Sequence, residues 1–249
     1  MKKPASIDEA MGVSFDKTHG IIPALDNYSL YGVLRTAEET TNIEGVVGYK
    51  IGLTIALQLG LSNAVAALRE VTDLPIIYDH QKAGPDIPDM GIKLCKLAAN
   101  AGVNGLVLFP LAGPSAVEAF VGGAINEKLS PFVGGDLPIK DYNVDGGGYV
   151  VDDALTHIFQ KSVELGATHF IVPGNTSDKV KLHGESLQSK IKKPSLVIPG
   201  IGALGGTISD CFEAASGCNA YAVIGRAIYG NDNPAEAAKR FAEEALTFA

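Results

Sequence analysis

The sequence predicts a single α/β domain folded as a (β/α)8 (TIM) barrel, and three observations support this prediction. The chain contains about eight apolar segments, and each of them is followed by a segment with helical character. Most apolar segments are continuous rather than alternating, which is typical of parallel strands covered on both faces. The length of 249 residues fits eight βα units. We therefore interpret 1–249 as one barrel domain, in which 1–20 form an N-terminal leader that packs over one end.

The expected strands are short apolar runs that end near glycine, proline or a charged residue. The fourth, Gly-Leu-Val-Leu-Phe-Pro, is typical of them. In chain order, strands are expected at 21–26, 46–52, 75–78, 105–110, 130–134, 169–174, 195–200 and 220–226.

The expected helices lie between these strands and are bounded by recognisable signals. Gly102 stops the helix after the third strand, and Pro234 begins the last helix, where proline suits the first turn. In chain order, helices are expected at 29–41, 54–70, 92–101, 115–127, 153–165, 178–189, 209–215 and 234–246. The loop 137–149 is rich in Asp and Gly, and it is interpreted as a surface excursion or a mobile lid.

A doubly wound open sheet is the alternative architecture. It normally carries a glycine-rich phosphate turn directly after its first strand. Here the first strand ends in Leu25-Asp26-Asn27-Tyr28, which contains no such turn. The sequence therefore favours the barrel.

Composition excludes several functional classes. The net charge of −8 and the lack of a basic cluster argue against a nucleic-acid partner. The three cysteines form no CxxC or Cys/His pattern, so we expect a reduced, cytoplasmic protein without a structural zinc site. The most apolar window, 51–68, is interrupted by polar residues, so no membrane span is expected.

Charged residues follow directly after the third expected strand, in PIIYDHQKAGPDIPDM (75–90). This stretch places Asp79, Lys82 and Asp86 within eight residues. The carboxyl ends of barrel strands form the active-site face, so these side chains are candidate catalytic groups. A polar loop with incidental charges is the alternative.

Two further charged residues, Asp26 and Lys50, lie at or near the ends of the first two strands. In a barrel these ends converge on one cavity with the third strand. A lysine inside an apolar strand is costly to bury unless a carboxylate pairs with it. The sequence therefore predicts a charged cluster, which is either catalytic or a structural ion-pair network at the barrel mouth.

A phosphate site is expected after strands seven and eight, the recurrent position for this fold. Strand seven ends in Pro199, Gly200 and Gly202, and strand eight ends in Gly225 and Arg226. Glycines let backbone N–H groups approach an anion, and an arginine pairs bidentately with it. Glycines that serve tight turns alone are the alternative. The five histidines are scattered and suggest no metal site.

These residues resemble the orotidine 5′-phosphate decarboxylase family over nearly the whole chain, from about Ile22 to Ala245. The motifs ALD, YKIG, the Asp/Lys/Asp stretch ending in Asp-Ile-Pro, IPGIGALGG and IGRAIYGNDNP occur in the family's order. The resemblance implies a homodimeric barrel that needs no cofactor or metal. It implies conversion of a small nucleotide, orotidine 5′-phosphate, to uridine 5′-phosphate and carbon dioxide.

The resemblance also implies a role for each motif residue. Lys50, Asp79, Lys82 and Asp86 would form a Lys-Asp-Lys-Asp network, in which Asp86 and the following Ile87 enter the neighbouring subunit's site. Asp26 would bind ribose hydroxyls, and the phosphate would bind at the glycine loop and at Gly225-Arg226. A protonated Lys82 beside C6 would stabilise the carbanion and then donate the proton.

The chain departs from the family pattern at two places. The family's stretch is D-x-K-x-x-D, whereas this one is D-x-x-K-x-x-x-D, so Lys82 reaches the cavity only if the strand bulges or ends early. Leu204 stands where the family commonly has a glutamine that bridges base and phosphate. The alternatives are a magnesium-dependent barrel of the 3-keto-gulonate 6-phosphate decarboxylase or hexulose-phosphate synthase type, and a non-catalytic nucleotide-binding barrel.

Overall fold

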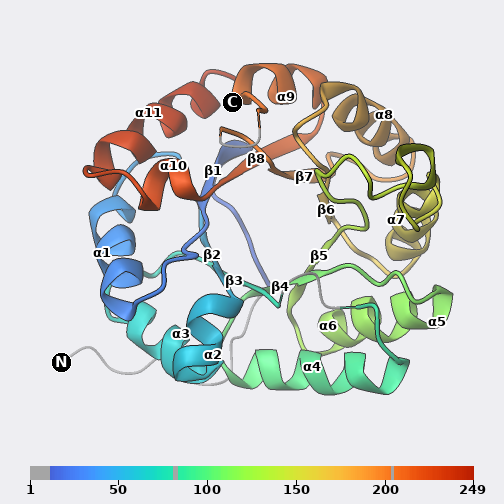
Figure 1. Cartoon of the computed structure of the whole chain (residues 1–249), viewed down its shortest axis with the longest axis horizontal. Helices are drawn as coiled ribbons and strands as arrows, with labels where there is room; N and C mark the ends of the chain where they lie inside the picture. Colours follow the sequence, from blue (N-terminus) through green and yellow to red (C-terminus); the bar gives the residue numbers. More distant parts are fainter. Residues whose placement is uncertain (1–11, 81–83, 203–204) are drawn as a thin grey trace.

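The structure is a computed structural model that describes residues 12–80, 84–202 and 205–249. Its centre is a ring of eight parallel strands surrounded by helices, which Figure 1 shows in a view down the ring. The strands pair in the order β1-β8-β7-β6-β5-β4-β3-β2. Two isolated bridges, Ile21 with Val46 and Ala24 with Lys50, join β1 to β2 and close the ring. The barrel expected from the sequence is therefore confirmed.

Every strand overlaps the segment that was expected for it. The strands are β1 (His19–Pro23), β2 (Tyr49–Gly52), β3 (Ile76–Asp79), β4 (Gly105–Leu108), β5 (Ser130–Val133), β6 (His169–Ile171), β7 (Ser195–Pro199) and β8 (Asn219–Ile224).

The helices form the outer layer of the ring. They are α1 (Leu30–Thr40), α2 (Leu53–Leu59), α3 (Leu61–Arg69), α4 (Pro88–Asn100), α5 (Pro114–Val117), α6 (Gly123–Asn126), α7 (Ala154–Glu164), α8 (Ser177–Gln188), α9 (Ile208–Ala214), α10 (Arg226–Tyr229) and α11 (Pro234–Leu246). A π-helical turn, Glu118–Gly122, joins α5 to α6, and a 3-10 turn, Val144–Gly146, lies in the loop after β5. Within the described residues, no helix is both long enough and apolar enough to cross a membrane.

The helical layer differs from expectation at three places. The single helix expected at 54–70 is two helices, because Gly60 between them has a φ of +76°, which a helix cannot contain. Helix α4 begins at Pro88 rather than at residue 92, since proline fits the first helical turn. The strand expected to reach Arg226 ends at Ile224, and the short helix α10 was not expected.

The core has two layers, set by the alternation of side chains along each strand. One set of side chains faces the helices, and the other fills the barrel interior. The interior cluster is built mainly from one inward residue of each strand except β2, namely Ile22, Ile77, Val107, Phe132, Ile171, Val197 and Tyr221, together with Val47, which precedes β2. Above this filled interior, towards the carboxyl ends of the strands, lies the cavity that forms the candidate site.

The chain segment before β1 closes the amino end of the barrel. The ring of Phe15 packs against Phe132 and Tyr221, with ring centroids 6.3 and 4.4 Å apart. The backbone N–H of Val13 donates to the hydroxyl of Ser130, the first residue of β5. The described part of the expected leader therefore contributes to the interior core.

Candidate active site

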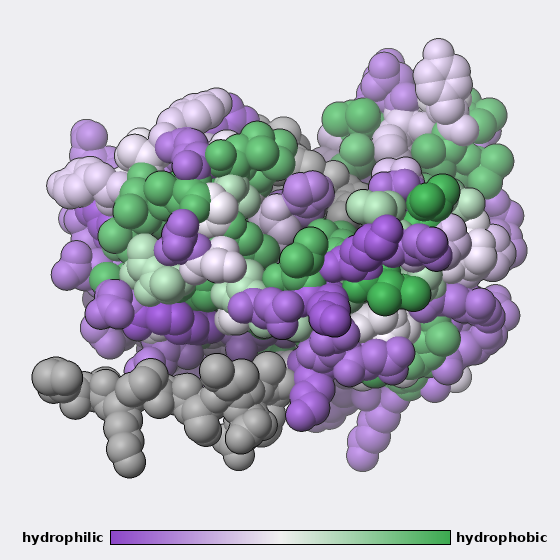
Figure 2. All heavy atoms as spheres, turned by 90° about the horizontal axis from the view of Figure 1, so that it is seen from below, coloured by the Kyte–Doolittle hydropathy of each residue, from purple (hydrophilic) through white to green (hydrophobic). Residues whose placement is uncertain are grey.

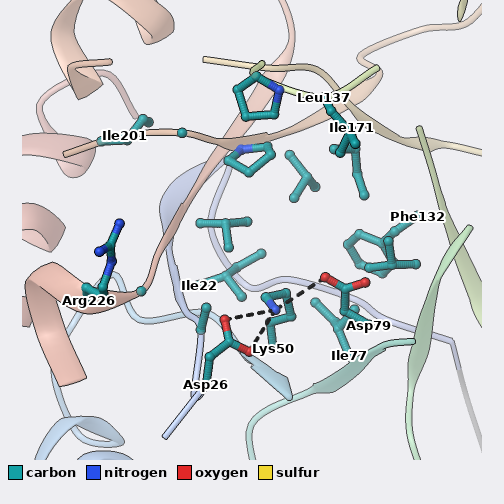
Figure 3. A pocket seen from close by; sticks show the side chains of 18 of the residues that line it. Ile22, Asp26, Lys50, Ile77, Asp79, Phe132, Leu137, Ile171, Ile201 and Arg226 are labelled. Atoms are coloured by element: carbon teal, nitrogen blue, oxygen red, sulfur yellow. Dashed lines mark hydrogen bonds and ion pairs between the residues drawn. The ribbon is translucent and has the colours of Figure 1, made fainter. Parts of the chain in front are cut away.

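Three charged side chains, two from neighbouring strands and one from the segment after β1, meet at the carboxyl end of the barrel (Figure 3). The ammonium of Lys50 in β2 donates to both carboxylate oxygens of Asp26, at 3.2 and 3.3 Å. It lies 3.3 Å from Oδ2 of Asp79, the last residue of β3. The strand-end rule thus brings together three of the residues that were selected from the sequence.

Burial makes this cluster electrostatically strong. The side chain of Lys50 is 12 % exposed and that of Asp79 is 2 % exposed. Burial acts to lower the pKa of Lys50, but the charges of Asp79 and Asp26 outweigh it and raise the pKa above its ordinary value. The lysine is therefore a fixed cation, and neither proton release nor general-base action at neutral pH is expected from it.

The cluster forms one wall of a cavity of about 330 Å³ at the barrel mouth. The floor is apolar and is formed by interior residues such as Ile22, Ile77 and Phe132. A mostly apolar cavity with a few convergent polar groups is typical of a small-molecule site. Its size suits a ligand of roughly nucleotide size.

The loop after β7 forms the opposite wall. Pro199 and Gly200 line the cavity, whereas Gly202 of the same loop is not among the lining residues. The loop is stabilised by its own backbone, since the N–H of Gly202 donates to Gly206 O at 2.9 Å and the N–H of Gly206 donates to Gly200 O at 3.1 Å. Gly200 has a φ of +98°, a conformation that favours glycine.

Gly225 and Arg226 extend this wall from the end of β8. Arg226 is exposed and is the first residue of α10. Figure 3 shows its side chain on the opposite side of the cavity from Asp79. Within the described residues, no carboxylate pairs with Arg226. The guanidinium is therefore available to bind an anion at the cavity edge.

Other sequence-selected residues lie apart from this cavity. Asp86 is exposed, and its carboxylate accepts a hydrogen bond from the N–H of Ile87 at 2.7 Å. Ile87 immediately precedes α4 and is 63 % exposed. Neither residue lines the cavity of its own chain. Lys82 and Leu204 lie outside the described residues.

The cavity also contains polar residues that the sequence reasoning missed. Asp136 follows β5 after two glycines, and the rule that selected Asp79, a carboxylate just after an apolar strand, could have found it. Tyr229 lies on α10. The apolar residues of β8 that precede this short helix contain no pattern that predicts a helix there. Among the residues the structure describes, no group of three or more His, Cys, Asp or Glu is placed to hold a metal ion.

Comparison with known proteins gives one consistent result. The family model described as "Orotidine 5'-phosphate decarboxylase / HUMPS family" matches residues 20–241. An orotidine 5′-phosphate decarboxylase from Methanococcoides burtonii is 30 % identical over 234 residues, which cover 92 % of this chain and 98 % of the relative. One from Thermococcus kodakarensis is 28 % identical over 226 residues, covering 91 % and 96 %.

Solved structures show the same fold at lower identity. An orotidine 5′-monophosphate decarboxylase from Methanocaldococcus jannaschii, crystallised with the inhibitor BMP, matches with a TM-score of 0.76 and 22 % identity, covering 91 % of this chain and 98 % of that one. An orotidine 5′-phosphate decarboxylase from Pyrococcus horikoshii matches with a TM-score of 0.72 and 24 % identity, covering 91 % and 99 %.

Proposed function

Because the chain belongs to the orotidine 5′-phosphate decarboxylase / HUMPS family, we propose that it decarboxylates orotidine 5′-phosphate to uridine 5′-phosphate. The protein is accordingly a carboxy-lyase of pyrimidine biosynthesis. We propose that it acts in the cytoplasm. One observation carries the proposal. Lys50 is held between Asp26 and Asp79 on one wall of the cavity. The glycine loop and Arg226, which pairs with no carboxylate of the described residues, lie on another.

The reaction breaks the bond between C6 of the pyrimidine and its carboxylate. The electron pair stays on C6, carbon dioxide leaves, and C6 then takes a proton. No adjacent group delocalises this charge, so nearby cations must stabilise it. Lys50 supplies a buried cation for this purpose. Lys82, which lies outside the described residues, is proposed as the proton donor. Asp79 is proposed to lie beside the substrate carboxylate and to repel it.

Magnitudes indicate which effect dominates. Repulsion between Asp79 and the substrate carboxylate, two unit charges about 4 Å apart at an effective dielectric of about 20, is worth about 4 kcal/mol. Enzymes lower barriers by roughly 8–23 kcal/mol. Repulsion alone is therefore too small, and stabilisation of the carbanion by the lysines must supply most of the acceleration.

The substrate's phosphate is proposed to bind at the wall formed by β7 and β8. Arg226 would pair with it, and the backbone of Gly200 and Gly225 would approach it closely beside Pro199. Gly202 lies further along the same loop and is proposed to complete the phosphate site. Asp26 would accept hydrogen bonds from ribose hydroxyls, since its side chain is 33 % exposed at the cavity. Binding energy from the phosphate would then hold C6 against Lys50.

A homodimer is proposed on the basis of the surface around α4. Asp86 and Ile87 lie outside their own cavity, and Met90, Ile92 and Leu97 of α4 are also exposed apolar residues. Figure 2 views the molecule from the side of α4 and shows apolar surface among hydrophilic residues there. In the proposed dimer, Asp86 and Ile87 complete the neighbouring subunit's site.

A second candidate is a sugar-phosphate enzyme of the HUMPS type, which the description of the matching family also includes. Such an enzyme would depend on magnesium. A binding barrel without catalysis is the third, and it would bind uridine 5′-phosphate without converting orotidine 5′-phosphate.

The deciding experiment follows the absorbance of orotidine 5′-phosphate after adding the purified full-length protein, with and without EDTA. Loss in both conditions is expected. Loss that EDTA abolishes would favour the magnesium-dependent candidate, and no loss in either condition would overturn the proposal. The Lys82→Ala variant should abolish turnover and still bind uridine 5′-phosphate.

A further inference from the structure

The buried carboxylate of Asp79 lies at the point where strand β3 ends. The register of β3 with β4 runs as far as Tyr78, opposite Leu106. Its register with β2 runs one residue further, to Asp79, opposite Gly52. Strand ends open more readily than strand centres, since fewer ladder hydrogen bonds hold them. Any contact that fixes this strand end therefore also fixes the direction of the carboxylate.

A pair of side chains on the opposite face of β3 makes such a contact. Residues i and i+2 of a strand share one face. Tyr78 packs in the core that faces the helices, whereas Asp79 lines the cavity. The hydroxyl of Tyr78 and Nδ1 of His80 form a hydrogen bond, and the two ring centroids are 5.5 Å apart. The hydrogen bond thus joins the residue before Asp79 to the residue after it.

We propose that His80 is a positioning residue, which acts through its hydrogen bond with Tyr78 to keep the carboxylate of Asp79 directed into the cavity. This inference rests on the proposed function, because that function places Asp79 beside the substrate carboxylate. Joining the two flanking residues restricts the backbone dihedrals between them. A displacement of about 1 Å at a reacting group can lower a rate by about a hundredfold, so a small movement of the strand end would affect turnover.

The same hydrogen bond satisfies a buried polar group. Tyr78 is 4 % exposed, and burial raises the pKa of its hydroxyl, which therefore keeps its proton and needs a partner. His80 is exposed and supplies that partner. A purely structural role predicts lower stability when the pair is broken, whereas the positioning role predicts lower turnover. The two effects can be measured separately.

The pair stands where this chain departs from the family's spacing. His80 begins the segment between Asp79 and Lys82, which is one residue longer than in the D-x-K pattern. The described chain resumes at Gly84, which packs against the residue after β4, because a Cβ there would lie 2.6 Å from the carbonyl carbon of Phe109. The chain is thus fixed on both sides of the longer segment, and the hydrogen-bonded pair fixes it on the strand side.

The test compares four variants: His80→Ala, His80→Asn, Tyr78→Phe and the double variant Tyr78→Phe/His80→Ala. Asparagine places an amide group near the position of Nδ1, so it can still bond to the tyrosine hydroxyl. His157→Ala is the matched control, because His157 is an exposed histidine that also makes a hydrogen bond and does not line the cavity. Three quantities are measured: turnover at saturating orotidine 5′-phosphate, the Kd of uridine 5′-phosphate, and unfolding in denaturant.

His80→Ala and Tyr78→Phe should each lower kcat by about tenfold to a hundredfold. The double variant should lose no more than either, because both changes remove the same hydrogen bond. His80→Asn should retain most of the wild-type kcat. The Kd of uridine 5′-phosphate should be unchanged in all of them, since the product has no carboxylate at C6. Unchanged binding also shows that the variants fold.

A kcat for His80→Ala and Tyr78→Phe equal to that of His157→Ala would overturn the inference and leave the pair a structural role. A loss that His80→Asn does not restore, or one matched by an equal loss of uridine 5′-phosphate binding, would overturn it as well. Tyr78→Phe keeps the test decisive if His80→Ala does not fold, because it removes the hydroxyl and leaves no buried polar group behind. Failure of the unmodified protein to decarboxylate orotidine 5′-phosphate would instead count against the proposed function.

Discussion

Lys50 and Asp79 meet diagonally across two neighbouring strands. In the β2–β3 register Lys50 lies opposite Ile77, and Asp79 is the next residue of β3 that faces inward. The ammonium lies 3.3 Å from the carboxylate. A shift of the register by one residue would turn Asp79 towards the helices, so the strand pairing itself fixes this ion pair.

Replacing Lys50 by Met should reduce decarboxylation by about a hundredfold to a thousandfold, because the charge that faces the developing carbanion is lost. Turnover of orotidine 5′-phosphate under saturating conditions measures this. Lys192→Met is the control, since Lys192 is exposed and lies in the loop before β7, at the amino end of the barrel. Equal turnover of the two variants would remove Lys50 from the mechanism.

The proposed dimer predicts complementation between two inactive variants. Lys50→Met lacks the cation in its own site, and Asp86→Ala lacks the carboxylate that it would give to its neighbour. A mixed dimer contains one site in which both residues are intact. Mixing and re-equilibrating equal amounts should restore about one quarter of the wild-type sites. If activity stays at the level of the separate variants, Asp86 does not act across a dimer interface.

Arg226→Ala should lower kcat/KM for orotidine 5′-phosphate by about tenfold to a hundredfold, as expected for a lost charged hydrogen bond. The slow turnover of orotidine, which has no phosphate, should be unchanged. Steady-state kinetics on both substrates give the comparison, with Arg240→Ala on α11 as the control. An equal loss on both substrates would mean that Arg226 does not bind the phosphate.

Burial lowers the pKa of His169 to about 4. The free energy of unfolding should therefore depend on pH through this residue, which does not line the cavity. Above pH 6.5 the imidazole is neutral in both folded and unfolded chains. Below it the unfolded chain takes up the proton first, so stability is lost as the pH falls towards 4. The loss from this residue is about 3 kcal/mol.

Denaturant unfolding at pH 7 and pH 4.5 tests this. The His169→Gln variant should lose less stability than the wild type over that range. The His157→Gln variant, whose histidine is 72 % exposed, should behave like the wild type. Identical pH dependence in the wild type and His169→Gln would refute the assignment.

The strands and the first half of the site could be predicted from the sequence. Apolar runs mark the strands because both faces are buried, and a charged residue at the end of such a run lies at the barrel mouth. Asp26, Lys50 and Asp79 follow this rule, and in the structure both carboxylates lie within 3.3 Å of the ammonium of Lys50.

The remainder depends on tertiary packing. Asp136 follows the same rule, but its burial and its contact with Lys179, 43 residues away, depend on the fold. The break at Gly60 depends on a positive φ, which a helical pattern does not reveal. Asp86 is exposed and does not line the cavity of its own chain, so its proposed role needs a second subunit, which the pattern of a single chain does not describe.

The segment before β1 has a consequence for how the protein is made. Tyr221 in β8 donates its hydroxyl to Lys17 O across 204 positions, and the only continuous ladder of β1 is with β8 among the described residues. Among the barrel strands, β1 leaves the ribosome first, and its pairing partner β8 leaves last. The barrel cannot seal until β8 has been synthesised, and until then the amino-terminal segment, Phe15 included, lacks its final partner and is more open to aggregation.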